Sequence, residues 1–353
     1  MFEPKAVSAI TRAEQITPQS LTALLVAHNL LQGGSVSAVH KRPEGSIPVA
    51  STRIAYLELE TSPGARLSIP KHLVFKFAVG SKEPFFYRDI APEMPEASWP
   101  CCYLSDYDPV ANISWLLLED LSQTHFQTQW PVPPDYHRCA AALDVLARLH
   151  AARWNDPRLE EVYRHHLTWE QSWAGRISLA IESFPTFIDF MSERLSPQRR
   201  EQYERILASS EHDWFPTSLA GSKTLLHGDA HFWNFLFPRE TGQRLFLIDW
   251  NPWDIGRSAD DLAYMLALHW YPERRARYER PLLERYHRAL LANGVQSYSW
   301  EALWQDYQLG VIRNLFIPIW QWQRGIHPSV WWSHLERAFL AYEDLGGEAR
   351  SYE

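Results

Sequence analysis

The chain has 353 residues, more than a single hydrophobic core usually serves, so two domains or lobes are expected. Its apolar fraction of 46% and charged fraction of 22% are ordinary for a soluble globular protein. The net charge of -8 argues against a nucleic acid or an anionic membrane as a partner, and no apolar run is long enough to span a membrane. The three cysteines, Cys101, Cys102 and Cys139, lack the spacing of a zinc site or a disulfide framework, which favours a reducing, cytoplasmic location.

Residues 1–120 carry the signals of a small lobe built on an antiparallel sheet. Thr17 and Pro18 precede an apolar-rich run and predict a capped helix that is stopped by Gly33 and Gly34. Turn-rich segments separate the first three strand-like runs that follow, as is typical of hairpins. The predicted strands are 36–41, 52–59, 73–78 and 114–121.

Lys76 is the unusual residue of this lobe. It lies inside the third predicted strand, between Phe75 and Phe77. A lysine in such an apolar run either extends its stem along an apolar face so that the ammonium reaches water, or it binds a phosphate with that ammonium. The residues alone leave the two interpretations equally open.

After residue 121 the sequence predicts a larger, mainly helical lobe. Asp135 caps a clear amphipathic helix over 136–154, in which His150 is expected to be packed or capping rather than catalytic. Strands before residue 120 and helices after it indicate an α+β fold with two lobes, 1–120 and 121–353. Further helical stretches are predicted at 169–173, 196–203, 260–270, 273–293, 300–324 and 329–345.

Three polar residues stand out in an apolar setting. Asp229 and Asn234 lie in the sequence His-Gly-Asp-Ala-His-Phe-Trp-Asn, which follows a short apolar run, and Asp249 ends a second apolar run. The turn-rich segment 238–242 between the two runs predicts a hairpin, which would bring the three residues into one small region. Carboxylate and amide oxygens suit Mg²⁺. The alternative is that Asp229 and Asn234 only cap a turn and that Asp249 only ends a strand.

The spacing of these residues is that of a kinase catalytic segment. Four residues separate Asp229 from Asn234, as they separate the catalytic-loop Asp of protein kinases from the metal-binding Asn, and a later Asp holds Mg²⁺. The pattern HGDxHxxN followed by IDW resembles the aminoglycoside phosphotransferase and choline kinase superfamily of small-molecule kinases. A downstream segment, 256–264, also resembles that superfamily. The resemblance covers roughly residues 36–270 and implies a bilobal protein-kinase-like fold, with a small antiparallel-sheet N-lobe and a large, mainly helical C-lobe.

The resemblance assigns nucleotide-binding roles in the small lobe. Lys76 would hold the nucleotide phosphates and pair with a helix glutamate. The sequence Glu83-Pro-Phe-Phe-Tyr87 resembles the E-x-x-F-Y motif of ecdysteroid-kinase-like members, which makes Glu83 that partner. The gap from Lys76 is shorter than is usual in the family, so Glu93 is the alternative.

Two further segments would contact the nucleotide by the same resemblance. The loop 42–51 would cover it, and the hydroxyl of Ser46 or Ser51 could contact phosphate, although a plain hairpin turn is an equally good interpretation of this loop. The strand 114–121 would run into an interlobe hinge. There, main-chain groups near Glu119 and Leu121 would bind the adenine edge.

In the large lobe, the resemblance implies that Asp229 orients the acceptor hydroxyl and accepts its proton, and that Asn234 and Asp249 hold Mg²⁺. Asp261 is expected to give structural support, either by accepting backbone N–H bonds of the catalytic loop or by capping its own helix. His227 is expected to orient nearby backbone.

The roles of His231 and Asp254 are left open by the sequence. Aromatic residues crowd the last helices, where most of them are expected to be core and a minority could line a substrate pocket. No acidic cluster suited to an aminoglycoside is evident, which ranks a neutral hydroxylated metabolite above an antibiotic as the substrate.

The resulting hypothesis is an ATP-dependent, Mg²⁺-dependent phosphotransferase that phosphorylates a hydroxyl group of a small molecule, with GTP as the other candidate nucleotide. A nucleotide-binding pseudokinase or regulatory module without turnover is the alternative, although nothing in the motif is broken. A protein kinase is disfavoured because the chain lacks a GxGxxG loop and an Ala-Pro-Glu segment. Transfer of AMP instead of phosphate is a further alternative.

Overall fold

The computed structural model describes residues 10, 12–42, 53–94, 98–166, 172–208 and 222–345. The chain divides into two compact units. The first unit comprises Met1–Phe126 and Leu236–Asn251, and the second comprises Gln127–Phe235 and Pro252–Glu353. The chain therefore leaves the first unit after Phe126 and returns to it for one short segment.

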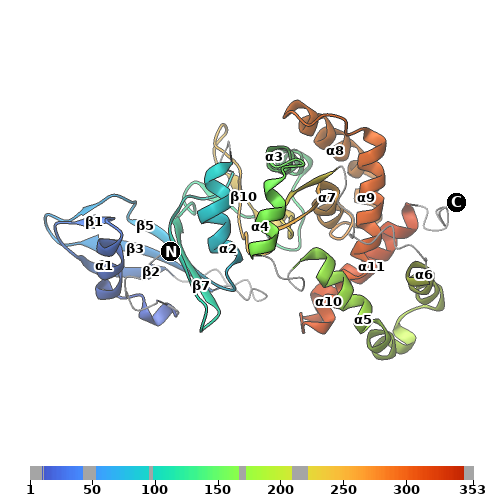
Figure 1. Ribbon diagram of the computed structural model, residues 1–353, viewed down its shortest axis with the longest axis horizontal. Helices are drawn as coiled ribbons and strands as arrows, with labels where there is room; N and C mark the ends of the chain where they lie inside the picture. The colour runs from blue at the N-terminus through green and yellow to red at the C-terminus, as the bar shows by residue number, and fades with distance from the viewer. Residues whose placement is uncertain are drawn as a thin grey trace. The chain divides into compact units, whose positions relative to one another are not determined.

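A five-stranded sheet forms the body of the first unit (Figure 1). In order across the sheet, its strands are β2 (Val36–Arg42), β3 (Arg53–Thr61), β5 (His72–Val79), β7 (Ile113–Glu119) and β6 (Cys102–Asp108). All neighbouring strands are antiparallel, and Lys76 in the central strand β5 pairs with Ile54 of β3 and Leu116 of β7. The four strands predicted from the sequence correspond to β2, β3, β5 and β7.

Helix α1 (Pro18–Ala27) packs against β2, and its buried leucines join the apolar core of the sheet. Thr17 caps this helix as predicted, since its Oγ1 accepts the N–H of Ser20 at 3.2 Å. Shorter elements complete the unit: η1 (Ala13–Gln15), β1 (Leu31–Gln32), β4 (Arg66–Leu67), α2 (Lys82–Phe85), η2 (Phe86–Ile90), η3 (Ala91–Glu93), β8 (His125–Phe126), β10 (Phe235–Pro238) and β11 (Phe246–Leu247).

The hairpin predicted around 238–242 exists, but one of its strands differs from the expected one. The sequence pattern placed the runs 224–226 and 245–249 on either side of the turn. In the structure β10 is the neighbour of β11. The run 224–226 belongs to β9 (Lys223–Leu226), which pairs antiparallel with β12 (Asp254–Arg257) in the second unit. The prediction was wrong on this point because a short apolar run carries no signal that selects its partner strand.

Helices dominate the second unit. They are α3 (Tyr136–Ala152), α4 (Arg158–His166), α5 (Trp173–Met191), α6 (Pro197–Ala208), α7 (Ser258–Leu266), α8 (Pro272–Ala292), α9 (Trp300–Asn314), α10 (Ile317–Gln323) and α11 (Pro328–Asp344), with the short turns η5 (Ser192–Arg194) and η6 (Phe232–Asn234). Helix α3 packs against α8, α7 against α9, and α10 against both α5 and α11. Asp135 caps α3 as predicted, because its Oδ1 accepts the N–H of Arg138 at 2.9 Å.

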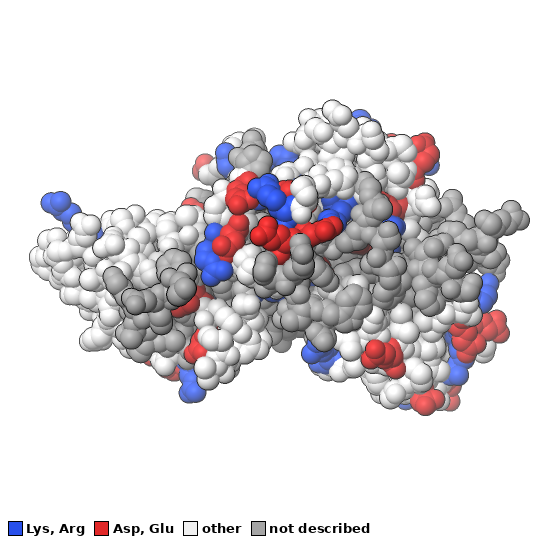
Figure 2. Space-filling model, viewed as in Figure 1, with Lys and Arg blue, Asp and Glu red and all other residues white. Residues whose placement is uncertain are grey.

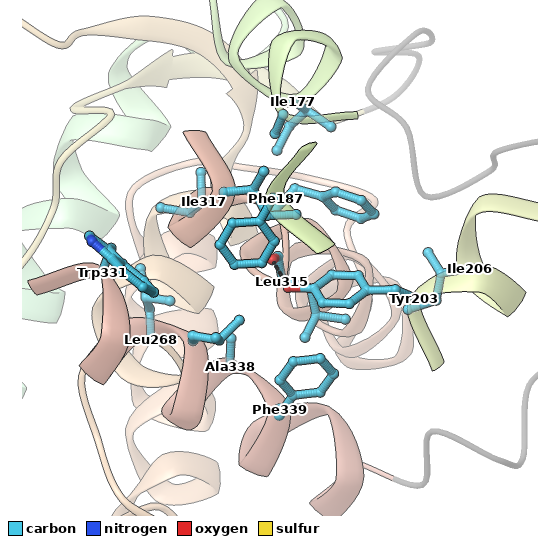
Figure 3. Close-up of a cluster of buried hydrophobic side chains, with 14 of the residues drawn as sticks. Ile177, Phe187, Tyr203, Ile206, Leu268, Leu315, Ile317, Trp331, Ala338 and Phe339 are labelled. Atoms are coloured by element: carbon cyan, nitrogen blue, oxygen red, sulfur yellow. Dashed lines mark hydrogen bonds between the residues drawn. The ribbon is translucent and has the colours of Figure 1, made fainter. Parts of the chain in front are cut away.

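A cluster of buried aromatic and aliphatic side chains joins several of these helices (Figure 3). Phe187 from α5 and Tyr203 from α6 are fully buried in it, together with Phe339 from α11. The Tyr203 hydroxyl donates a hydrogen bond of 2.6 Å to the carbonyl of Leu315, so its polar end is satisfied inside the core. Burial of such side chains, worth roughly 1.5–3 kcal/mol each, fixes the helices that carry the candidate site.

Two helix predictions needed correction. The single helix expected over 300–324 is two helices, α9 and α10, with a break at Leu315 and Phe316. Pro318 follows the break and occupies the first turn of α10, where its missing N–H costs no helical hydrogen bond. The helix expected over 260–270 begins earlier, at Ser258, and ends at Leu266. Most of the predicted stretch 169–173 lies outside the described residues.

Basic and acidic side chains are interspersed among the residues coloured in Figure 2. All three cysteines are free. In the described ranges, no helix combines the length and the apolar character needed to cross a membrane.

Candidate active site

In the first unit, Lys76 bridges two carboxylates. Its Nζ lies 2.7 Å from Oε1 of Glu83 on α2 and 2.8 Å from Oδ1 of Asp249, which follows β11. The lysine is 5% exposed and Glu83 is 1% exposed, so this is a buried ion pair. Glu93, the alternative partner in the sequence, is exposed. Glu83 is therefore the glutamate that pairs with Lys76.

The charges of this group shift one another's protonation equilibria. Burial opposes the charged ammonium and lowers the pKa of Lys76, but the carboxylates of Asp249 and Glu83 outweigh it and the pKa is raised. Burial raises the pKa of Glu83, Lys76 opposes that rise and Asp249 adds to it. Lys76 thus stays protonated and is shared between two acids.

Backbone geometry fixes Asp249 beside the lysine. Its φ is 65°, in the left-handed region that a non-glycine residue seldom occupies. The next residue, Trp250, donates its N–H to Oε1 of Glu83 at 3.2 Å and stacks its ring on Phe86 at 3.7 Å between centroids. Glu83 therefore binds both the lysine and the backbone that follows Asp249.

In the second unit, Asp229 and Asn234 lie on one short loop. The amide nitrogen of Asn234 donates to the carbonyl oxygen of Asp229 at 2.9 Å and to its Oδ2 at 3.2 Å. The turn η6, which ends at Asn234, brings the Asn234 side chain back to the aspartate. His231 lies beside them, with its Nε2 3.5 Å from Oδ2 of Asp229. The His231 pairing offers a second orienting contact for this carboxylate.

Asp261 holds the backbone that precedes Asp229. Its Oδ2 accepts the N–H of His227 at 2.7 Å and its Oδ1 accepts that of Gly228 at 2.9 Å. His150 lies behind it, with Nε2 3.2 Å from Oδ2 of Asp261 and Nδ1 2.7 Å from the hydroxyl of Tyr286. The expectations that Asp261 orders this loop and that His150 is a packed residue are confirmed by these contacts.

Tyr264 is a site residue that sequence reasoning missed. Burial raises its pKa well above the ordinary value, and the charge of Asp229 and a hydrogen bond to its carboxylate raise it further. The hydroxyl therefore remains protonated and donates to Asp229. Tyr264 lies in the downstream segment that resembled the superfamily, but nothing in that segment pointed to its contact with Asp229.

Two buried histidines, His269 and His334, pack edge to face beside His231. His269 lies 5.6 Å from the ring of His231 and 4.8 Å from that of His334. Burial lowers the pKa of His269 well below its ordinary value and lowers that of His334 to about 3. Both rings are consequently neutral in the physiological pH range and act as polar aromatic surface rather than as cations.

Asp254 supports the local fold by accepting backbone hydrogen bonds. It is buried, and its carboxylate accepts the N–H of Trp173 at the start of α5 and the N–H of Ile255. It thereby caps the α5 N-terminus, where a negative charge is favourable.

Glu119 ends β7, and Leu121 follows it after one residue. The Glu119 N–H donates to the carbonyl of Cys101 at 2.9 Å, and the Leu121 carbonyl accepts the N–H of His125 at 2.8 Å. The Leu121 N–H forms no hydrogen bond with any described residue. Ser46 and Ser51, the candidates in the predicted phosphate loop, lie outside the described residues.

Asn234, in the second unit, and Asp249, in the first, each carry a side-chain oxygen of the kind that hard cations bind. Both hydrogen bonds of the Asn234 side chain to Asp229 use its nitrogen and not its amide oxygen. The Asp249 side chain is 35% exposed. One or two carboxylates or amides, completed by waters and phosphate oxygens, are typical of Mg²⁺. In the described ranges, no group of three His, Cys, Asp or Glu residues is placed to hold a metal.

Comparison with known proteins places this geometry in a family. The family model for the ecdysteroid kinase-like family matches residues 69–296, which is more than half of the chain. No curated protein matches. The chain belongs to the ecdysteroid kinase-like family.

Solved structures share the fold at low sequence identity. A Ralstonia eutropha protein assigned to the aminoglycoside phosphotransferases is 16% identical, with a TM-score of 0.58 over 92% of this chain and 97% of that one. A choline/ethanolamine kinase family protein from Mesorhizobium loti is 12% identical, with a TM-score of 0.54 over 86% of this chain and 88% of that one. Spectinomycin phosphotransferase, in complex with ADP and spectinomycin, is 12% identical, with a TM-score of 0.50 over 93% and 99%. The predicted fold, a kinase-like α+β fold with an antiparallel sheet and a mainly helical part, is confirmed.

Proposed function

We propose that the chain is an ATP-dependent, Mg²⁺-dependent phosphotransferase that phosphorylates a hydroxyl group of a small molecule. The observation that carries this proposal is the buried Lys76, which is held protonated by Glu83 and Asp249. A buried ammonium with two acids is costly to maintain for folding alone. It is well suited to binding the phosphates of a nucleotide.

The nucleotide side of the proposed site combines this lysine with the strand end at β7. Lys76 would contact the phosphates, the Leu121 N–H and main-chain atoms near Glu119 would bind the adenine edge, and Ser46 would contact phosphate. Structures with the same fold that were crystallised with ADP or AMP-PNP support nucleotide binding. Small-molecule substrates in those crystals, spectinomycin and hygromycin B, support a small acceptor.

Asn234 and Asp249 are the proposed Mg²⁺ ligands. When bound with the nucleotide, the ion supplies neutralisation of charge on the phosphate oxygens. Asn234 also donates a hydrogen bond to the carboxylate of Asp229. The same side chain would therefore bind the metal ion and orient the catalytic base.

Asp229 is the proposed catalytic base. It would orient the acceptor hydroxyl and accept its proton while the acceptor oxygen forms a bond to the γ-phosphorus. The bond from that phosphorus to the β–γ bridging oxygen breaks, and ADP leaves. Because phosphoryl transfer is loose, most of the rate comes from positioning and charge stabilisation, which Asn234, His231 and Tyr264 support at Asp229.

A thermal-unfolding assay with nucleotide tests the binding half of the proposal. Mg-ATP or Mg-GTP at a hundred times its dissociation constant should stabilise the protein by about 2.7 kcal/mol. The shift should require Mg²⁺ and should vanish in Asp249→Ala. Asp89→Ala removes an exposed acid from the same unit and should keep it. No shift with either nucleotide at millimolar concentration would exclude the proposed nucleotide site.

Turnover tests the catalytic half. Asp229→Asn should abolish ADP release with a hydroxylated acceptor while leaving Mg-nucleotide binding unchanged. Nucleotide binding by the wild type without turnover, over a broad acceptor screen, would indicate a pseudokinase instead. The mass of a modified acceptor separates transfer of phosphate from transfer of AMP.

A further inference from the structure

His150 is a fully buried histidine near the end of α3, on a helix face that is otherwise apolar. Leu146 and Ala147, one turn earlier on the same face, are fully buried as well. An aliphatic side chain would pack there without placing ring nitrogens in the core, where an unpaired polar group is costly. Both nitrogens of His150 are paired, and one of them contacts Asp261, which holds the backbone before Asp229. These contacts point to a role beyond packing.

The hydrogen bonds around His150 determine where its ring proton lies. Oδ2 of Asp261 also accepts the N–H of His227, and a carboxylate has no proton to donate. The His150 Nε2, 3.2 Å from the same oxygen, therefore carries the ring proton. In the neutral ring Nδ1 is then an acceptor, and the hydroxyl of Tyr286, 2.7 Å away, is its donor. Burial raises the pKa of Tyr286, which keeps that hydroxyl protonated.

These three side chains, which we call the Tyr286–His150–Asp261 relay, join three helices. Tyr286 comes from α8, His150 from α3 and Asp261 from α7. All three are buried, so water does not compete for their hydrogen bonds. Thr224 on β9 donates its hydroxyl to the His150 carbonyl at 2.6 Å, which fixes the end of α3 to the strand that leads into the loop.

Asp261 transmits this order to the backbone just before Asp229. Its Oδ2 and Oδ1 accept the N–H groups of His227 and Gly228, one on each oxygen. The carboxylate can hold both N–H groups only while its plane keeps one orientation, and the His150 N–H on Oδ2 helps to fix that plane. A displacement of about 1 Å at a reacting group can cost about 100-fold in rate. The orientation of this buried carboxylate therefore matters for the position of Asp229.

We propose that His150 is a positioning residue for phosphoryl transfer, held in its Nε2–H tautomer by Tyr286 so that it orients Asp261 and, through the loop backbone, Asp229. This inference rests on the proposed function, because it takes Asp229 as the base whose position limits the rate. His150 acts through Asp261 and takes no part in proton transfer to or from the acceptor.

Turnover of two His150 variants tests this role. His150→Gln keeps an N–H donor that can reach Asp261, whereas His150→Leu removes it. In the leucine variant kcat for ADP release should fall roughly 10- to 100-fold, with the KM for Mg-nucleotide unchanged. The glutamine variant should recover most of that loss. Each protein is assayed well below its melting temperature, so that its folded fraction does not affect kcat. Unchanged kcat in His150→Leu, or equal losses in the two variants, would contradict the proposal.

Tyr286→Phe tests the other end of the relay. It removes the donor to Nδ1, so the ring is no longer held in one tautomer, and kcat should fall several-fold at unchanged nucleotide KM. Tyr307→Phe is the matched control, because Tyr307 is also fully buried and its hydroxyl donates to Glu279 at 2.8 Å, outside the relay. The control should lower stability and keep kcat. Equal kcat in the two variants would show that Tyr286 does not act on His150.

Nuclear magnetic resonance measures the relay without turnover. Long-range ¹H–¹⁵N spectra of imidazole-labelled protein, with the His150 signals assigned by their loss in His150→Gln, should show a protonated Nε2 and an unprotonated Nδ1. The Gly228 amide should exchange with solvent at least about tenfold faster in His150→Leu, while the amides of α9 keep their rates. A proton on Nδ1 or unchanged Gly228 exchange would overturn the inference. Wild-type protein that shows this tautomer and this exchange, yet binds no nucleotide and turns over no acceptor, would place the failure in the proposed function.

Discussion

Gly228 donates its N–H to Oδ1 of Asp261 at 2.9 Å, and it does so from a backbone φ of 77°. The left-handed conformation turns the chain immediately before Asp229. A residue with a side chain would be strained there, and glycine is the residue that adopts this region at little cost. The glycine of the His-Gly-Asp sequence is therefore explained by the fold of the loop itself.

Replacing Gly228 with alanine should be strongly destabilising. A Cβ at this position would lie 2.3 Å from the carbonyl oxygen of Pro252, a backbone atom that cannot rotate away. The positive φ alone costs of order 1–3 kcal/mol, and the clash adds to it. Gly242→Ala is the matched control, because Gly242 has a φ of 89° and nothing within 4 Å of its Cβ position. Urea unfolding should show a clearly larger loss for Gly228→Ala, and equal losses would mean that the loop moves freely.

Lys76→Met should cost far more stability than the loss of an exposed lysine. The substitution leaves the carboxylates of Glu83 and Asp249 next to each other without the ammonium that holds them. Breaking a buried pair in this way typically costs about 3–5 kcal/mol. Lys71→Met, just before the same strand but exposed, should stay within about 0.5 kcal/mol.

A double variant tests whether the Lys76 and Glu83 side chains interact directly. Glu83→Gln removes one of the two acids, so the Lys76→Met/Glu83→Gln protein should lose less stability than the sum of the single losses. Chemical denaturation of the four proteins gives this coupling. Additive losses would contradict a direct interaction between the two side chains.

Sequence reasoning succeeded for residues whose role could be inferred from a local sequence pattern. Lys76 was singled out because a lysine between two phenylalanines in a strand needs an explanation, and the E-x-x-F-Y resemblance then pointed to Glu83, which the structure pairs with it. Asp261 was expected to accept backbone N–H groups of the catalytic loop or to cap its helix, and the structure shows the first. Both inferences depend on residues close in sequence or on a motif, so no tertiary packing had to be known.

The same reasoning failed where contacts join distant segments. The pairing of β9 with β12 was missed because the apolar run of β9 would fit several partner strands. Tyr264, 35 positions after Asp229, lay in the segment that resembled the superfamily and in an apolar helix, but neither gave it a role of its own. The contact of His150 with Tyr286 depends on how α3 packs against α8, which neither periodicity nor motif encodes.

Asp156 should make the free energy of unfolding depend on pH in the acid range. A hydrogen bond from the Arg158 side chain, opposed by partial burial and aided by Arg153, lowers the pKa of Asp156 from 3.8 to about 2. Because the folded-state pKa is depressed, the unfolded chain takes up the proton first. The stabilisation is therefore fully present above the ordinary pKa and is lost as the pH falls through the folded-state value.

The comparison of wild type with Asp156→Asn measures this contribution. Their difference in free energy of unfolding should be constant above about pH 4 and should shrink toward zero near pH 2. Arg158→Gln should remove most of the pH dependence, because Arg158 is the largest cause of the shift. A difference that stays constant down to pH 2 would show that the Asp156 pKa is not lowered by folding.

Tyr264→Phe should reduce turnover without weakening nucleotide binding. The variant keeps the ring that packs against Trp173 and removes only the hydroxyl that donates to Asp229. A hydrogen bond to a charged group is worth about 1.5–3 kcal/mol, so kcat for ADP release should fall about 10- to 100-fold while the Mg-nucleotide Kd is unchanged. Tyr203→Phe is the control, since it removes a buried hydroxyl that binds the Leu315 carbonyl in the same core cluster. That control should lower stability and leave kcat near the wild-type value. Equal losses of kcat in the two variants would assign Tyr264 to packing alone.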